Sequence, residues 1–235
     1  LEAAYARSHA LLYKPGAHPL YATLTLFRDQ IPAAVSQLTP HIIWVTLLFV
    51  TSILAGHWMV RTYPDLIGLF ASPGLIATVE RGELWTEGLL NIMPSSVLSV
   101  KILTNNIIVS LFAFCAGFLF GLGTFYIVAL NGLMLGAVFA FTALYGLDDN
   151  LFSFIVAHGC VELSCMCLSG AAGASIGEAL IRPRVATRTQ AFQQAAAPPG
   201  RVLFICVLLL IGAGFIEGYI SPAPQVPLGT RVAVG

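Results

Sequence analysis

Two ionisable residues, His158 and Glu162, lie one helical turn apart in the apolar stretch AHGCVELSCMCLSGAAGASIG, residues 157–177. At positions i and i+4 their side chains share one face of a helix. Such a pair is compatible with a hydrogen-bonded structural lock, a proton- or ion-handling site, two metal ligands or a catalytic dyad. The structural lock is favoured, with Asn131 as a further partner. A catalytic dyad would need a nucleophile, and none is evident beside the pair, while the metalloprotease motif H-E-x-x-H is absent. We therefore predict no enzymatic activity.

The composition decides which solvent these two side chains meet. Of 235 residues, 57% are hydrophobic and only 9% are charged, with a mean hydropathy of +0.86. Soluble domains carry about a quarter charged residues, so the chain is predicted to be an integral membrane protein. Its formal net charge is +0 and no basic run with interleaved aromatic residues occurs, which argues against nucleic-acid binding. The chain begins at Leu1 without a signal-peptide pattern, and we expect a further segment before it.

The cysteines do not form a recognisable disulfide framework or metal motif. All of them lie in apolar stretches, where cysteine behaves as a small hydrophobic residue. Three of them lie near His158, but their spacing matches no zinc pattern, so we predict no metal and no cofactor. The five are Cys115, Cys160, Cys165, Cys167 and Cys206.

Apolar runs long enough to cross a membrane predict an all-α, polytopic membrane helix bundle. A crossing needs ~20 mostly apolar residues. The uncharged stretch from 102 to 147 is long enough for two crossings, with a turn in GFLFGLGTFY, residues 117–126. We predict a cytoplasmic amphipathic arm over 1–38, a membrane domain over 39–220 and an irregular extracytoplasmic tail over 221–235. The predicted helices cover about 41–60, 102–121, 123–147, 151–181 and 202–220.

Basic residues outside the crossings predict the orientation. Loops rich in Lys and Arg stay in the cytoplasm. Five crossings place the arm and the loop after the fourth helix on the same side, with the C-terminus opposite. We therefore expect a cytoplasmic N-terminus and an extracytoplasmic C-terminus. The basic residues concerned are Arg7, Lys14, Arg28, Arg182, Arg184, Arg188 and Arg201.

The segment 61–100 lies outside the membrane in this scheme. Ser72-Pro73 is typical of a helix cap followed by a first-turn proline. Glu80, Glu83 and Glu87 then fall on one face of the predicted helix, with Trp85 beside them. The segment is interpreted either as a helix lying on the membrane interface or as a docking surface for an extracytoplasmic partner.

Glycines recur at G-x-x-x-G spacing in four of the predicted helices. Such pairs let helix backbones approach closely in lipid, which favours a compact bundle or a homo-oligomer. Asn131-Gly132 falls within the third crossing, where Asn131 either bonds a neighbouring helix or marks a broken helix that lines a cavity. The glycine pairs are Gly117 and Gly121, Gly132 and Gly136, Gly173 and Gly177, and Gly214 and Gly218.

Several motifs together resemble the stage II sporulation protein M family. HGCVEL (His158–Leu163) followed by SGAAGASIGEALIRP (Ser169–Pro183) is similar to the His-Gly-x-x-Glu signature of that family. NNIIVSLFAFCAGFLFGLGTFYIVALNGLMLGAVF (Asn105–Phe139) resembles the family's helix pair. YARSHALLYKPG (Tyr5–Gly16) is similar to the arm of the longer, non-sporulation branch.

The resemblance implies a bacterial inner (cytoplasmic) membrane protein of about five helices without known enzymatic activity. It departs from the pattern at Cys160, at Cys165–Cys167 and at Arg184, where the family usually has aliphatic or small residues and a glycine. In the sporulating branch, the member is the membrane scaffold of a complex with two peptidoglycan-degrading partners. In the wider branch, it is typically encoded beside other membrane proteins and a chaperone-type ATPase.

Two functional hypotheses from different classes follow. The first is a non-enzymatic scaffold that assembles membrane or envelope proteins, possible partners in cell-envelope or peptidoglycan remodelling, and that contacts membrane lipid. The alternative is a transporter or channel-like subunit that uses His158 and Glu162 inside the membrane. A cavity reaching the pair favours the alternative, and a dry, closed pair favours the lock.

Overall fold

The structure is a computed structural model that describes residues 19–84, 95–156, 159–183, 185 and 187–219. Within these residues the fold is all-α, as predicted. Five helices are long and apolar enough to cross a membrane. The protein is therefore a multi-pass helical membrane protein. The five candidate spans are Thr23–Thr62, Val100–Phe118, Leu122–Leu144, Gly159–Ile181 and Ala197–Gly214.

The described helical elements follow one another along the chain. Shorter helices lie between the long ones: η2 and α4 after the first span, α8 before the fourth and α10 before the fifth. The bounds are α2 Pro19–Thr25, η1 Leu26–Gln30, α3 Ile31–Thr62, η2 Pro64–Leu69, α4 Pro73–Glu80, α6 Ser95–Cys115, η3 Ala116–Phe118, α7 Leu122–Leu144, α8 Asp148–Ile155, α9 Gly159–Ile181, α10 Arg188–Ala195 and α11 Ala197–Tyr219.

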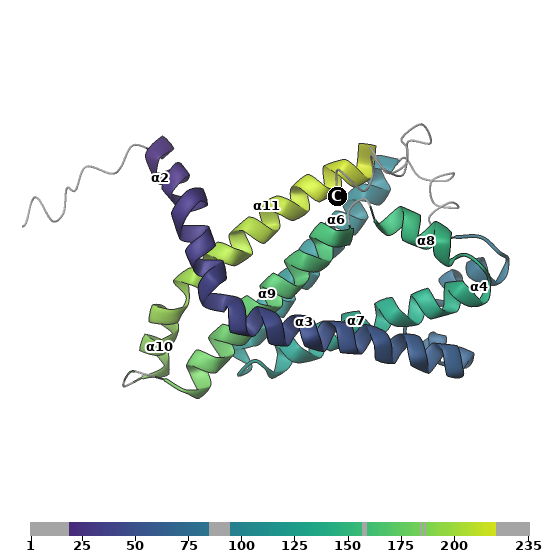
Figure 1. Ribbon diagram of the computed structural model, residues 1–235, viewed down its shortest axis with the longest axis horizontal. Coiled ribbons are helices and arrows are strands. Elements are labelled where there is room, and N and C mark those ends of the chain that lie inside the picture. Colours follow the sequence, from purple (N-terminus) through teal and green to yellow (C-terminus); the bar gives the residue numbers. More distant parts are fainter. Residues whose placement is uncertain (1–18, 85–94, 157–158, 184, 186, 220–235) are drawn as a thin grey trace, which may run out of the picture.

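Two predicted helix boundaries are wrong. The first crossing was expected to begin after Pro40, but α3 starts at Ile31 and Pro40 lies inside it. Proline removes one backbone hydrogen bond and bends a helix without ending it when packing holds both sides. Figure 1 shows the bend between α2 and the main run of α3. The fourth crossing, expected over 151–181, is divided into α8 and α9, so the span itself begins at Gly159.

Backbone contacts at glycines hold α9 against the turn between α6 and α7. A Cβ added at Gly117 would meet the Gly173 carbonyl group, and one at Gly177 would lie 2.7 Å from the Cα of Gly121. A Cβ at Gly173 would lie 2.5 Å from the Ala113 carbonyl oxygen. The Gly117/Gly121 pair and the Gly173/Gly177 pair therefore pack on each other within one chain. There is no room for a side chain at Gly117, Gly173 or Gly177, and the positive φ of Gly121 disfavours one there.

A second set of glycines brings α7 against α3. A Cβ at Gly132 would lie 2.7 Å from the Phe49 carbonyl oxygen, and one at Gly136 would meet that of Ile53. Gly56 of α3 makes the reciprocal contact, since a Cβ added there would meet the backbone of Leu133 in α7. Among the described elements, α3 and α7 make the most extensive contact.

The long helices form two groups that diverge. Figure 1 shows α3 and α7 running together, and α6, α9 and α11 running together beside them. The groups lie close near α10 and spread apart toward α4 and α8. The glycine contacts of Gly117 and Gly173 hold the end near α10. Contacts of another kind must therefore hold the two groups together at the opposite end.

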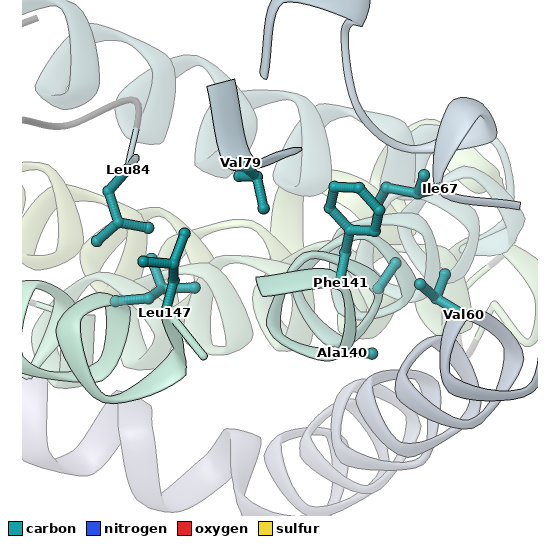
Figure 2. Packing of buried hydrophobic residues seen from close by; sticks show 9 residues of the cluster. Val60, Ile67, Val79, Leu84, Ala140, Phe141 and Leu147 are labelled. Carbon is teal, nitrogen blue, oxygen red and sulfur yellow. The ribbon is translucent and has the colours of Figure 1, made fainter. Parts of the chain in front are cut away.

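A hydrophobic cluster fixes η2, α4 and α8 to the spread end of the bundle. Val79 is 0% exposed and Leu84 2%, and both pack with Val60 of α3, Phe141 of α7 and Leu151 of α8. Figure 2 shows the side chains pointing toward one another from these separate elements. We call the residues 63–84 and 147–155 the cap. Because Ile67, Val79, Leu84, Leu147 and Leu151 are buried against the bundle, the cap is a packed part of the fold.

Both ends of α4 are fixed by local backbone and side-chain contacts. Ser72 caps α4 as predicted, since its Oγ accepts a hydrogen bond of 3.3 Å from the Leu75 amide. The helix ends at Glu80, because Gly82 has φ 78° and the amide of Glu83 bonds the Thr78 carbonyl oxygen at 3.2 Å.

The predicted stripe of three glutamates on one helix is therefore wrong. Glu80 closes α4 and Glu83 follows the turn. Glu87 and Trp85 lie outside the described residues. Both described carboxylates are exposed on the cap, and Glu83 lies 4.0 Å from the Arg81 guanidinium.

Replacing Gly173 with leucine should prevent the close approach of α9 to α6. Inserting a larger side chain into a packed site costs about 1–3 kcal/mol or more, and here the obstacle is backbone. We expect loss of monodisperse protein by size-exclusion chromatography and a lower melting temperature. Gly212→Leu is the matched control, because a Cβ at this exposed glycine meets nothing within 4 Å. Equal behaviour of the two variants would refute the packing account.

Candidate functional site

A cavity of about 380 Å³ lies between the two diverging helix groups, beneath the cap. Residues from α3, α6, α7, α8, α9 and the η2–α4 connection line it, so it is a product of the tertiary fold. Cavities of this size that are mostly apolar, with a few polar groups, are typical of small-molecule sites. Its lining residues are Phe49, Phe70, Ala71, Ser72, Leu75, Ile102, Asn105, Asn106, Val109, Asn131, Met134, Leu135, Val138, Leu151, Ile155, Gly159, Glu162, Leu163 and Met166.

Glu162 is the one acidic residue among the described lining residues. It lies in the first turn of α9, is half-buried, and the Asn106 carboxamide of α6 hydrogen-bonds to its carboxyl group. No Lys, Arg or His is among the described residues that line the cavity. A carboxyl group inside a membrane domain is costly and marks a functional site by default. The geometry therefore makes Glu162 and Asn106 the polar centre of the cavity.

Asn131 lines the same cavity but bonds its own helix. Its Nδ2 donates a hydrogen bond of 2.8 Å to the Ile127 carbonyl oxygen, four residues earlier in α7. We expected Asn131 to hydrogen-bond a neighbouring helix, but its amide bonds α7 itself. The alternative of a broken helix is wrong as well, because α7 runs from Leu122 to Leu144. Asn131 keeps its carbonyl oxygen as an acceptor.

Some predicted site residues lie outside the part of the chain that the structure describes. They are His158, Trp85 and Glu87, and the contacts of Gly218 lie outside it as well. Gly214 is buried in α11, where a Cβ would lie 2.9 Å from the Leu103 side chain of α6. The predicted pairing of His158 with Glu162 thus stays a prediction.

The cavity occupies only the half of the membrane domain near the cap. Its lining in α9 ends at Met166, and its deepest α7 residue is Asn131. Beyond it, Val128 and Met166 belong to a buried cluster, and a Cβ at Gly170 would lie 2.9 Å from Val128. Tight packing therefore separates the cavity from the opposite end of the bundle.

One sequence match to a nucleophile motif occurs, but its place in the fold is not that of a nucleophile elbow. GASIG, Gly173–Gly177, fits G-x-S-x-G, so the interpretation that the sequence offers a dyad no such nucleophile motif is wrong. In hydrolases this serine sits on a sharp strand-to-helix turn. Ser175 instead lies inside α9 and donates a hydrogen bond of 2.9 Å to the Ala172 carbonyl oxygen. Among the described residues no three His, Cys, Asp or Glu side chains gather as a metal site would require.

A second polar contact lies at the end of the bundle near α10. His41 Nε2 of α3 lies 2.8 Å from Glu178 Oε2 of α9, which joins the two helix groups where they are closest. The sequence interpretation singled out neither residue. It also passed over Asn105 and Asn106 as site residues, although an Asn-Asn pair inside an uncharged stretch was a usable signal.

These features define a multi-pass α-helical membrane protein with a cap and a polar-centred cavity within its bundle. The chain belongs to the stage II sporulation protein M family, whose model matches residues 45–222. The match covers the membrane domain from the first span to the last. No significant match is found among curated proteins or among solved structures.

Cysteine labelling tests the cavity directly. In a background with exposed Cys115 and Cys160 replaced by serine, Asn131→Cys should react with a small polar thiol reagent, because Asn131 lines the cavity. Val128→Cys is the control, since Val128 is 0% exposed one turn earlier in the same helix. Mass spectrometry of intact protein in lipid nanodiscs measures the difference. If Asn131→Cys were as unreactive as Val128→Cys, the cavity would not be accessible to the reagent.

Proposed function

We propose that the protein is a non-enzymatic membrane scaffold that docks a partner protein on its cap. The observation that supports this is the fixed attachment of the cap to the bundle through fully buried side chains such as Val79 and Leu84. A segment that merely rested on lipid would not need this core. A rigid, charged surface at one end of a bundle is suited to docking, because little free energy is lost in ordering that surface when a partner binds.

The charges of the cap favour a partner with a basic surface. Among the described residues of this end, exposed acidic side chains outnumber basic ones, which suits electrostatic steering of such a partner. The acidic residues are Asp65, Glu80, Glu83, Asp148 and Asp149, and the basic ones are Arg61, Arg81 and Lys101.

The opposite end of the bundle carries the reverse balance, which supports the proposed orientation. Basic side chains predominate among the described residues there, so by the positive-inside rule we propose that this end faces the cytoplasm and that the cap faces outward. We propose a bacterial inner membrane location because the chain belongs to the stage II sporulation protein M family. The basic residues are Arg28, Arg182, Arg188 and Arg201, and the acidic ones are Asp29 and Glu178.

Self-association is a separate prediction. The four glycines of the 117/121 and 173/177 pairs and the two of the 132/136 pair are already covered by contacts within the chain. A second copy would therefore have to bind through another face.

Reversing the charge of the cap should release the partner. We expect Glu80→Lys combined with Glu83→Lys to keep a folded, monodisperse protein, because both side chains are exposed. Proteins that co-purify stoichiometrically with the tagged wild type from native membranes should be lost from the variant, as quantitative mass spectrometry would measure. Asp29→Asn, at the opposite end, should retain them. If the wild type brings down no partner, or the cap variant keeps it, docking on the cap is wrong.

A transporter or channel-like subunit is the second candidate function, and the cavity at Glu162 favours it. A lock would bury the carboxyl group among donors in a closed site, whereas Glu162 lines a cavity of about 380 Å³. In this conformation packing around Val128 and Gly170 separates the cavity from the other end. Transport would therefore require a second conformation that opens this end.

The transport candidate makes its own prediction for Glu162→Gln. The amide occupies the same space and can still bond Asn106, so the protein should remain folded. Proton or alkali-cation flux in reconstituted vesicles should be abolished, while Glu80→Gln should behave as wild type. Absence of flux in the wild type under every gradient tested would remove transport and leave the scaffold proposal intact.

A further inference from the structure

We propose that the cavity beneath the cap is a binding site for an amphipathic molecule with a primary ammonium head and an aliphatic body. The head would contact Glu162 and the neighbouring amides, and the body would lie along the apolar lining of α7 and α9. A bound ligand need not cross the membrane or touch a partner, so this proposal is independent of both functions above.

The charge of the head follows from the carboxyl group of Glu162 in the cavity lining. Glu162 has the Asn106 carboxamide as its partner, and no basic side chain is among the described lining residues. A buried carboxylate is tolerated when a cation accompanies it. An incoming ammonium group supplies that cation, and the attraction is strengthened because the surroundings exclude much of the water.

The kind of ammonium group follows from the other polar atoms. Asn131 donates its Nδ2 to the Ile127 carbonyl oxygen, which leaves its Oδ1 to accept a hydrogen bond from a ligand. Asn105 adds a second amide to the lining. A primary ammonium has three N–H donors, which the carboxylate and these carbonyl oxygens would accept. A quaternary ammonium has none and is typically bound by an aromatic cage, whereas only two phenylalanines, Phe49 and Phe70, are among the described lining residues.

The apolar part of the ligand follows from the rest of the lining. Met134, Leu135 and Val138 of α7 face the cavity together with Leu163 and Met166 of α9. Methionine side chains adapt to flexible aliphatic chains because they are unbranched and polarisable. A cavity of about 380 Å³ suits one head group with a single chain of moderate length. The ligand class is therefore a single-chain alkyl or acyl amine.

The test uses a decylammonium probe with a photoreactive diazirine in its chain. The full-length chain is placed in nanodiscs of phosphatidylcholine, whose head group is quaternary and does not compete as a primary amine. Covalent labelling is measured against probe concentration and mapped by peptide mass spectrometry. Probes with the same chain but an alcohol or a carboxylate head serve as comparators. Each variant is first shown to be monodisperse.

We expect saturable labelling of cavity-lining peptides of α6, α7 and α9 by the ammonium probe alone. Glu162→Gln should weaken it by about tenfold or more, the loss of one charge-assisted contact. Met134→Trp, which fills the cavity and keeps Glu162, should prevent labelling, and Glu80→Gln on the exposed cap should change nothing. Displacement by unlabelled decylamine but not by decyltrimethylammonium would identify the primary amine.

Three results would overturn the proposal. One is equal labelling by the alcohol probe, which would show that the cavity recognises only the chain. Another is unchanged affinity in Glu162→Gln. The third is labelling that maps outside the cavity or survives Met134→Trp, and this result decides the matter even if Glu162→Gln fails to fold.

Discussion

The close approach of helix backbones at glycines is the constraint on which the rest of this structure depends. Inside a bilayer, water does not drive helices together, so attraction comes from packing and from small residues that permit it. Gly117 and Gly173 let α9 touch the α6–α7 turn, and Gly132 and Gly136 let α7 touch α3. Each of these contacts is made by backbone atoms, which cannot move aside for a side chain.

These contacts also explain why the molecule has a cavity. Helices that are joined tightly at one end and packed in two groups spread apart toward the other end, as Figure 1 shows. The opening is closed by a different kind of force, since the cap packs through Val79, Leu84 and Phe141 as a water-soluble domain would. Between the glycine contacts and the cap, the spread leaves space that side chains of α6, α7 and α9 do not fill.

The sequence predicts the architecture well, because the signals of membrane helices are local. Uncharged stretches, the Ser72 cap and the turn near Gly121 can each be recognised from a few neighbouring residues. The errors arise where tertiary packing overrides a local rule. Pro40 bends a helix without ending it, and Gly82 ends one that the glutamate spacing seemed to continue.

The site is less predictable because its residues come from several helices. Glu162 is conspicuous in sequence, since a charge in an apolar run is rare. Asn106 is recognised as a site residue only from the structure, because nothing in the sequence says that the middle of α6 faces the start of α9. His41 and Glu178 meet across α3 and α9 for the same reason, 137 residues apart in the chain.

The surroundings of Glu162 favour a ligand-binding role over a purely structural lock. A lock would lie in closed packing, whereas Glu162 lines a cavity of about 380 Å³ together with Asn106 and Asn131. The Asn106 carboxamide hydrogen-bonds to its carboxyl group, and Asn131 donates its amide to the Ile127 carbonyl oxygen of its own helix. An ionised carboxylate has about four acceptor sites, so Glu162 can also accept a hydrogen bond from a donor that enters the cavity. A carboxyl group is costly inside a membrane domain, and a ligand that contacts it would offset part of that cost.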